Sequence, residues 1–140
     1  MVETTMLNRQ RARNMKMKPT TAWYKTAAII ATLMFILFAA LQLNDPDPLY
    51  WFLVYAAVAV VAAAAAVGRH LPRFALVTLG VVIAGVLIAA PGFVDYLQSG
   101  DWGSIGKHMS DEAPYIEQGR EFVGLLIAAA ALLLLTRRSG

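Results

Sequence analysis

The apolar and polar residues of this chain fall into long separate blocks, which is not the pattern of a soluble surface. Four blocks are apolar and contain no charged residue; they cover residues 26–43, 49–67, 74–90 and 122–135. A bilayer core about 30 Å thick is crossed by roughly 20 residues of helix. Because backbone groups in lipid must be hydrogen-bonded internally, each block is predicted to be a transmembrane helix.

The fourth apolar block is short, since its 14 residues rise only about 21 Å as a helix. To cross the bilayer, this helix must begin earlier, near residue 116. Its first turns then carry Glu117, Arg120 and Glu121 at headgroup level, and Pro114 suits an early helical position. The sequence therefore predicts spans at 26–43, 49–67, 74–90 and 116–135, with a long outer loop at 91–113.

The composition agrees with this interpretation. The chain has 140 residues, of which 59% are hydrophobic, whereas soluble domains average roughly 45–50%. The first apolar run exceeds the 7–15 residues of a signal-peptide core, so we expect a retained anchor. The predicted fold class is all-α, an integral membrane four-helix bundle at 26–140 that follows a basic tail at 1–25.

The charges are distributed unevenly between the two sides of this predicted bundle. Ten of the twelve Lys and Arg residues lie in the tail, the second connection and the C-terminus, while eight of the nine acids lie on the other side. Basic residues favour the cytoplasmic side, so both termini are predicted to be cytoplasmic in a bacterial inner membrane. The tail could also contact anionic lipid or a partner. No folded basic module indicates nucleic-acid binding.

Aromatic residues mark the ends of the spans. Amphipathic rings favour the membrane interface, and the predicted interface anchors are Trp23, Tyr24, Tyr50, Trp51 and Trp102. Trp102 belongs to a short segment of the outer loop that is expected to lie on the membrane surface. Small residues are frequent in the second and third spans, and they allow close helix packing. The sequence leaves open whether they pack within the bundle or against another subunit.

Chemical groups suited to catalysis or cofactor binding are scarce. Cysteine is absent, and the two histidines, His70 and His108, fall in connections on opposite sides of the membrane. None of the four apolar blocks contains an ionisable group of the kind that transporters and proton relays use. Common catalytic and nucleotide-binding motifs are also missing. We therefore expect no catalysis by this chain, no cofactor and no metal site.

The segment between the first two spans reads NDPDP. Asn44 tolerates the left-handed conformation that ends helices, and a residue before proline favours extended geometry, which suits Asp45 and Asp47. An aspartate cap followed by proline starts a helix well, so Asp47 with Pro48, or Asp45 with Pro46, is expected to start the second span. The corner is thus predicted to be a stiff turn.

This corner and the start of the fourth span should lie at the same membrane level. Together they form a predicted outer-face polar cluster of Asn44, Asp45, Asp47, Glu117, Arg120 and Glu121. Arg120 could pair with Asp45, Asp47 or Asp95 and tie the fourth helix to the first hairpin. The aspartates could instead be unlinked caps, or the carboxylates could bind a divalent cation. These three interpretations remain open.

Two motifs resemble a known family. QLNDPDPLYW at the end of the first span and EQGREFVGLLI at the start of the fourth are similar to the transmembrane protein 220 family, over roughly residues 26–135. The resemblance implies a small four-helix membrane protein of a family without an assigned activity. It implies no catalytic or ligand-binding residues.

The function expected from the sequence is that of a non-catalytic accessory or structural subunit. Its partners would be the lipid bilayer and other subunits of a larger membrane complex, of respiratory or photosynthetic type. The alternative is a small carrier or divalent-ion-binding protein that uses the acidic outer face. An enzyme component whose site is completed by another chain is a third possibility, with Arg120 and Glu121 as candidates.

Overall fold

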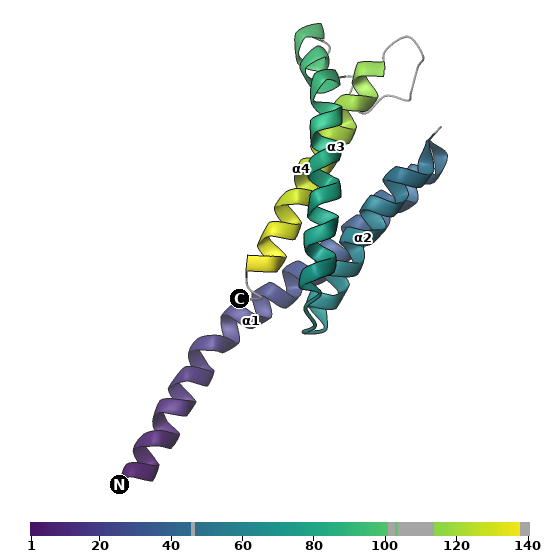
Figure 1. Ribbon diagram of the computed structural model, residues 1–140. Helices are drawn as coiled ribbons and strands as arrows, with labels where there is room; N and C mark the ends of the chain where they lie inside the picture. Colours follow the sequence, from purple (N-terminus) through teal and green to yellow (C-terminus); the bar gives the residue numbers. More distant parts are fainter. Residues whose placement is uncertain (46, 101–102, 104–113, 138–140) are drawn as a thin grey trace.

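The computed structural model describes residues 1–45, 47–100, 103 and 114–137, with the side chains of 12–21, 114 and 115 excepted. The elements are α1 (Val2–Leu41), a short 3₁₀ turn η1 (Gln42–Asn44), α2 (Pro48–Ala66), α3 (Pro72–Ser99) and α4 (Pro114–Arg137) (Figure 1). No strand occurs within these described ranges. The predicted all-helical architecture is confirmed.

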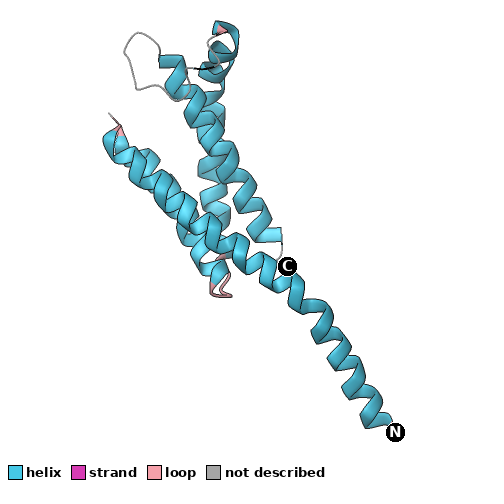
Figure 2. Cartoon of the chain, turned by 180° about the vertical axis from the view of Figure 1, so that it is seen from behind, coloured by secondary structure: helices cyan, strands magenta, loops and turns pink. Residues whose placement is uncertain are grey.

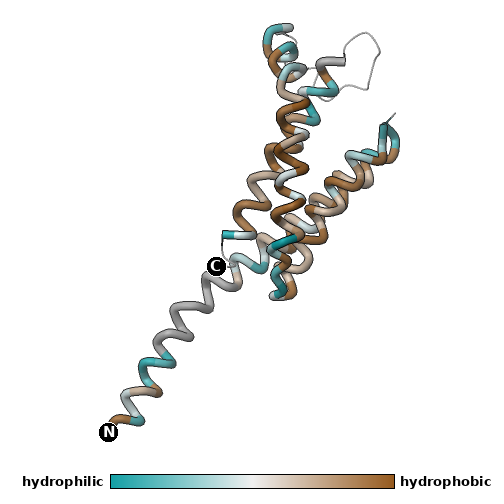
Figure 3. The backbone as a smooth tube through the Cα atoms, in the orientation of Figure 1, coloured by the Kyte–Doolittle hydropathy of each residue, from teal (hydrophilic) through white to brown (hydrophobic). Residues whose placement is uncertain are grey.

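All four predicted membrane spans are present. Helices long and apolar enough to cross a bilayer cover Ala22–Asn44, Pro48–Ala66, Pro72–Ser99 and Ile116–Arg137. The fourth begins where the length argument placed it, near residue 116. Figure 3 shows the apolar residues concentrated along the middle of the bundle and hydrophilic residues toward its two ends.

The third helix is longer than predicted. Its expected end at residue 90 is wrong, because α3 continues through Pro91 to Ser99 and then meets Gly100 in the left-handed conformation, at φ 71°. Proline inside a membrane helix is tolerated where neighbouring groups compensate for the lost donor. Only the later part of the predicted outer loop therefore follows α3. Most of that part, Trp102 included, lies outside the described residues.

The predicted basic tail is helical along its backbone. α1 begins at Val2 and runs without a break into the first span. Figure 1 shows this N-terminal part of α1 extending beyond the other helices as a single helix. The boundary between tail and span is therefore a change of composition within one continuous helix.

The helices form two hairpins. α1 packs along α2, α3 packs along α4, and α2 also contacts both α3 and α4. In Figures 1 and 2 the hairpins lie together near the α2–α3 turn and diverge toward the α1–α2 corner. We call the end near the α2–α3 turn the basic end; it carries Lys25, Arg69, Arg73 and Arg137. We call the opposite end the acidic end; it carries Asp45, Asp47, Asp95, Glu117 and Glu121.

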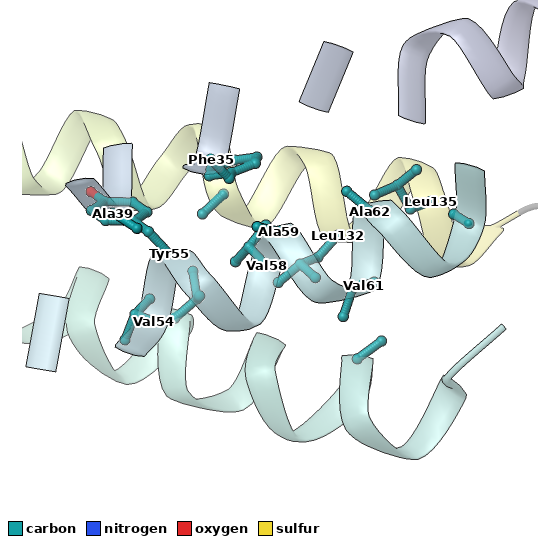
Figure 4. Packing of buried hydrophobic residues seen from close by; sticks show 14 of the residues in the cluster. Phe35, Ala39, Val54, Tyr55, Val58, Ala59, Val61, Ala62, Leu132 and Leu135 are labelled. Atoms are coloured by element: carbon teal, nitrogen blue, oxygen red, sulfur yellow. The ribbon is translucent and has the colours of Figure 1, made fainter. Parts of the chain in front are cut away.

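A single apolar core joins the four helices. Its largest fully buried side chains are Phe35, Leu125, Leu132, Val58 and Val82, which come from all four (Figure 4). On α2 the buried alanines recur every three residues, at 59, 62 and 65. Small side chains at this spacing let helix backbones approach closely. All three pack within the bundle, although Ala59 also lines a groove on the α1–α2 hairpin.

Threonine hydroxyls within the spans are hydrogen-bonded inside their own helices. The hydroxyls of Thr26, Thr32, Thr78 and Thr136 each donate to the carbonyl oxygen four residues earlier, at 2.7–2.9 Å. In lipid an unsatisfied hydroxyl is costly, and the preceding turn of helix is the nearest acceptor. These threonines are therefore compatible with membrane burial.

The packing of α4 gives a direct test. Replacing Ala128, which is 0% exposed, with Leu adds volume to a filled site and should cost about 1–3 kcal/mol of stability. Ala130 lies two residues along the same helix and is exposed, so Ala130→Leu should change stability little. Denaturant unfolding of both variants in detergent measures the difference. Equal stability of the two variants would contradict the assigned core face of α4.

Candidate functional site

The α1–α2 corner has the geometry expected for most of its residues. Asp45 is extended, at φ −83° and ψ 155°, and Pro48 is the first residue of α2. Asp47 occupies the cap position before it. The predicted extended Asp45 is confirmed, and of the two predicted helix starts the structure has Pro48 after Asp47. The extended geometry predicted for Asp47 is wrong, because its ψ is 65°.

Two details of the corner differ from the prediction. Asn44 is not left-handed, because every described residue with a positive φ is a glycine. The chain instead tightens into η1, and the Asp45 N–H donates to the Gln42 carbonyl at 3.0 Å. The Asp47 side chain makes no capping hydrogen bond. A 3₁₀ turn satisfies carbonyls at a helix end, so this turn takes the place of a left-handed cap.

A cavity of about 220 Å³ opens between the two hairpins at the acidic end. Its polar lining consists of Gln42, Asp45, Tyr55, Arg120 and Glu121. These side chains come from η1, the corner, α2 and the first turns of α4. The structure thus brings three members of the predicted polar cluster to one cavity, namely Asp45, Arg120 and Glu121.

The remaining members of the predicted cluster lie outside the cavity wall. Glu117 is half-buried one turn before Glu121, and Asp47 and Asn44 are exposed. The structure thus brings only part of the predicted cluster to the cavity.

The direct ion pair predicted for Arg120 is not formed in this structure. Within the part of the chain that the structure describes, no carboxylate oxygen lies within 4.0 Å of the Arg120 guanidinium. Arg120 lines the cavity together with Asp45 and Glu121 but forms an ion pair with neither. The cavity thus presents one guanidinium and two carboxyl groups side by side.

The first turns of α4 are held in place by α3. Phe93 stacks on Phe122 with ring centroids 4.3 Å apart. The Gln118 side chain lies directly over Gly92, where a Cβ would collide with it. These contacts fix the orientation of α4 and so direct Arg120 and Glu121 toward the α1–α2 hairpin.

Tyr55 is the cavity residue that sequence reasoning missed. It is only 3% exposed, and its ring lies 6.2 Å from Phe35 and 5.6 Å from Phe38, centroid to centroid (Figure 4). Its hydroxyl extends to Gly124, another lining residue, and a Cβ at that glycine would collide with it. Both the tyrosine in α2 and the glycine in α4 are visible in the sequence. Their spacing along the chain, however, does not show that they come into contact.

The Tyr55 hydroxyl has no hydrogen bond to any other described residue. No fully buried polar side-chain atom of the described residues lacks a partner, so this hydroxyl is accessible although the rest of the side chain is buried. Since Tyr55 lines the cavity, its donor faces the same space as the charged groups. The cavity therefore has a free donor at its apolar base and charged groups on its other walls.

The predicted interface anchors lie in different environments. Trp23 is exposed, as expected for a lipid-facing ring, whereas the Tyr24 hydroxyl donates to the Leu135 carbonyl at 2.8 Å and links α1 to α4. The Tyr50 hydroxyl donates to the Val81 carbonyl at 3.4 Å, and Trp51 packs edge-on against Tyr50. The two tyrosines thus also connect helices.

The family model described as transmembrane family 220, helix, matches residues 34–137, about three quarters of the chain. The chain belongs to transmembrane family 220. The match contains both the NDPDP corner and the charged start of α4, so the predicted resemblance is confirmed. Members of family 220 are transmembrane proteins of uncharacterised function. The candidate site is therefore inferred from the arrangement of its residues in the structure. No curated protein and no solved structure matches the chain.

The cavity of this family 220 chain is suited to binding. Asp45 and Glu121 accept hydrogen bonds, Arg120 and Tyr55 donate them, and the Gln42 amide does both. The described residues contain no group of three or more His, Cys, Asp or Glu side chains placed to hold a metal ion. The arrangement can receive a positive and a negative group at the same time.

The contact between Tyr55 and Gly124 can be tested by substitution. Gly124→Ala places a methyl group against the Tyr55 hydroxyl and should destabilise the bundle by about 1–3 kcal/mol. Gly80→Ala is the control, since nothing lies within 4 Å of its added Cβ and alanine favours helix. Thermal unfolding in detergent measures both variants.

Tyr55→Phe removes the hydroxyl and should restore part of the stability lost in Gly124→Ala. A double-mutant cycle over the two positions isolates this coupling. Purely additive effects would show that the hydroxyl does not occupy the space beside Gly124.

Proposed function

We propose that this family 220 protein is a non-catalytic accessory subunit that packs against a larger membrane complex, of respiratory or photosynthetic type. The observation that supports this role best is an apolar groove on the α1–α2 hairpin. The groove encloses about 370 Å³ and includes Thr32, Ile36, Ala40, Leu43 and Ala63 in its lining.

The composition of this groove suits another transmembrane helix. Five of its lining residues are alanines, at 39, 40, 56, 59 and 63. In lipid there is no hydrophobic driving force for helices to associate, so they associate through close packing. Small residues allow this packing because they let two helix backbones approach closely. The exposed side chains of Ile36, Leu43 and Val60 form the raised rim of the groove. A helix seated there would contact both α1 and α2.

We further propose that the basic end faces the cytoplasm of a bacterial inner membrane, with both termini on that side. Lys25, Arg69, Arg73 and Arg137 lie at that end, and the acids gather at the other. Positive residues favour the cytoplasmic side. The N-terminal part of α1 then extends into the cytoplasm, where its basic residues can contact anionic lipid or a partner.

Filling the groove tests the accessory role. Ala40 is exposed and lines the groove, so Ala40→Leu should block a docked helix without disturbing the core. Ala84→Leu, at an exposed position on α3, is the matched control. The measurement is stoichiometric co-purification from native membranes in mild detergent, and the expected result is loss of the partner with Ala40→Leu alone.

Two outcomes of this experiment would contradict the accessory role. One is a wild-type chain that purifies alone, with no stoichiometric partner. The other is a partner that remains bound equally to both variants, which would place the docking face elsewhere.

The second candidate function is a small carrier or divalent-ion-binding protein that uses the acidic end. The cavity with Asp45 and Glu121 favours it. Calcium takes six to eight oxygen ligands, however, and the Arg120 cation in the same wall opposes a second cation. This candidate predicts thermal stabilisation by calcium, magnesium or zinc that disappears in Asp45→Asn with Asp47→Asn. No metal-dependent shift would count against it.

A further inference from the structure

We propose that the cavity at the acidic end binds the headgroup of a zwitterionic lipid that carries a primary ammonium and a phosphodiester, the chemistry of phosphatidylethanolamine. This binding site is distinct from the accessory role, which uses an apolar groove on α1 and α2 with different lining residues. Four observations support it: the position of the cavity, its charged groups, the hydroxyl of a buried tyrosine and its size.

The cavity lies at the boundary between apolar and polar parts of the bundle. The first span ends at Asn44 and the fourth begins at Ile116, so Asp45, Arg120 and Glu121 are at the level of lipid headgroups. Leu41, Val123 and Ile127 also line the cavity and are exposed. Since these apolar side chains face outward, the mouth is suited to acyl chains while the polar walls are suited to a headgroup.

The charges in the cavity match a zwitterion. The Arg120 guanidinium, which makes no ion pair with a described carboxylate, is suited to a phosphate because its planar fork donates two parallel hydrogen bonds. Asp45 and Glu121 are acceptors for an ammonium group. A primary ammonium donates up to three hydrogen bonds, whereas a quaternary ammonium donates none. The pair of carboxylates therefore favours ethanolamine over choline.

Tyr55 provides an observation that does not depend on the charged cluster. Its side chain is 3% exposed, it lines the cavity, and its hydroxyl is without a hydrogen bond among the described residues. Phe35 and Phe38 hold the ring, and Gly124 leaves space for the hydroxyl. Because no fully buried polar side-chain atom of the described residues lacks a partner, the hydroxyl is accessible from the cavity, where a ligand group can accept its hydrogen bond. A phosphate or ester oxygen of the lipid is such an acceptor.

The cavity size restricts the part of the lipid that enters. A volume of about 220 Å³ corresponds to roughly seven water molecules at about 30 Å³ each. This is enough for a compact headgroup and too small for acyl chains. The chains would lie outside, along Val123 and Ile127 on α4.

Binding of short-chain lipids to the delipidated full-length chain in detergent tests the proposal, with native mass spectrometry as the readout. The probes are dihexanoyl phosphatidylethanolamine, the matching phosphatidylcholine, the matching phosphatidylglycerol and free phosphoethanolamine. We expect the ethanolamine lipid to bind about tenfold more tightly than the choline lipid, since it adds hydrogen bonds to charged acceptors.

The variants that test the site are Glu121→Gln, Arg120→Gln and Tyr55→Phe, with Arg69→Gln at the basic end as the control. Glu121→Gln should remove most of the preference for ethanolamine over choline. Arg120→Gln and Tyr55→Phe should weaken all the phospholipids, and Arg69→Gln should change nothing. An unchanged melting temperature for each variant shows that the bundle is intact.

Three results would overturn the proposal. Equal affinity for the ethanolamine and choline lipids would exclude recognition of the primary ammonium, and tightest binding of phosphatidylglycerol would show that only a negative charge is recognised. Equal affinity for free phosphoethanolamine and the short-chain lipid would exclude a lipid as the source of the headgroup.

Discussion

The constraint on which this structure depends is the absence of water from the bilayer core. Backbone donors and acceptors there must be paired within the chain, so the four apolar blocks become continuous helices. The same constraint explains why the threonines donate to their own helices. It also explains why charged side chains gather at the two ends of the bundle. The polar chemistry of this protein is therefore confined to the membrane boundaries.

Within these limits, α2 determines the shape of the bundle. It contacts each of the other three helices, and its alanines at 59, 62 and 65 are buried. Toward the acidic end α2 carries larger side chains, and Tyr55 packs against both Phe35 and Phe38 of α1. The hairpins diverge there, and the space between them becomes the polar cavity.

The sequence predicted what depends on local chemistry. Apolar run length predicted the spans, including the early start of α4, and proline geometry predicted the extended Asp45 and the helix start at Pro48. Tertiary contacts decided the rest. Helix packing lets α3 continue through Pro91, and a 3₁₀ turn replaced the expected conformation of Asn44.

The same difference between local chemistry and tertiary contacts explains why only part of the candidate site was predicted. Asp45, Arg120 and Glu121 share a membrane level that can be read from sequence, and the structure places them around one cavity. Their separation, and the absence of a direct ion pair between these described residues, depend on how far the hairpins diverge. The role of Tyr55 depends on Gly124 lying opposite it, which no local pattern could reveal.

The central claim is that the end of α1 and the start of α4 face each other across one cavity. Because the chain contains no cysteine, a Gln42→Cys, Val123→Cys double variant can be treated in membranes with a short bifunctional thiol reagent. Both positions line the cavity, so efficient intramolecular cross-linking is expected. The control pair is Gln42→Cys with Val94→Cys, an exposed α3 position outside the cavity lining, and it should cross-link poorly. Equal cross-linking of the two pairs would contradict the account.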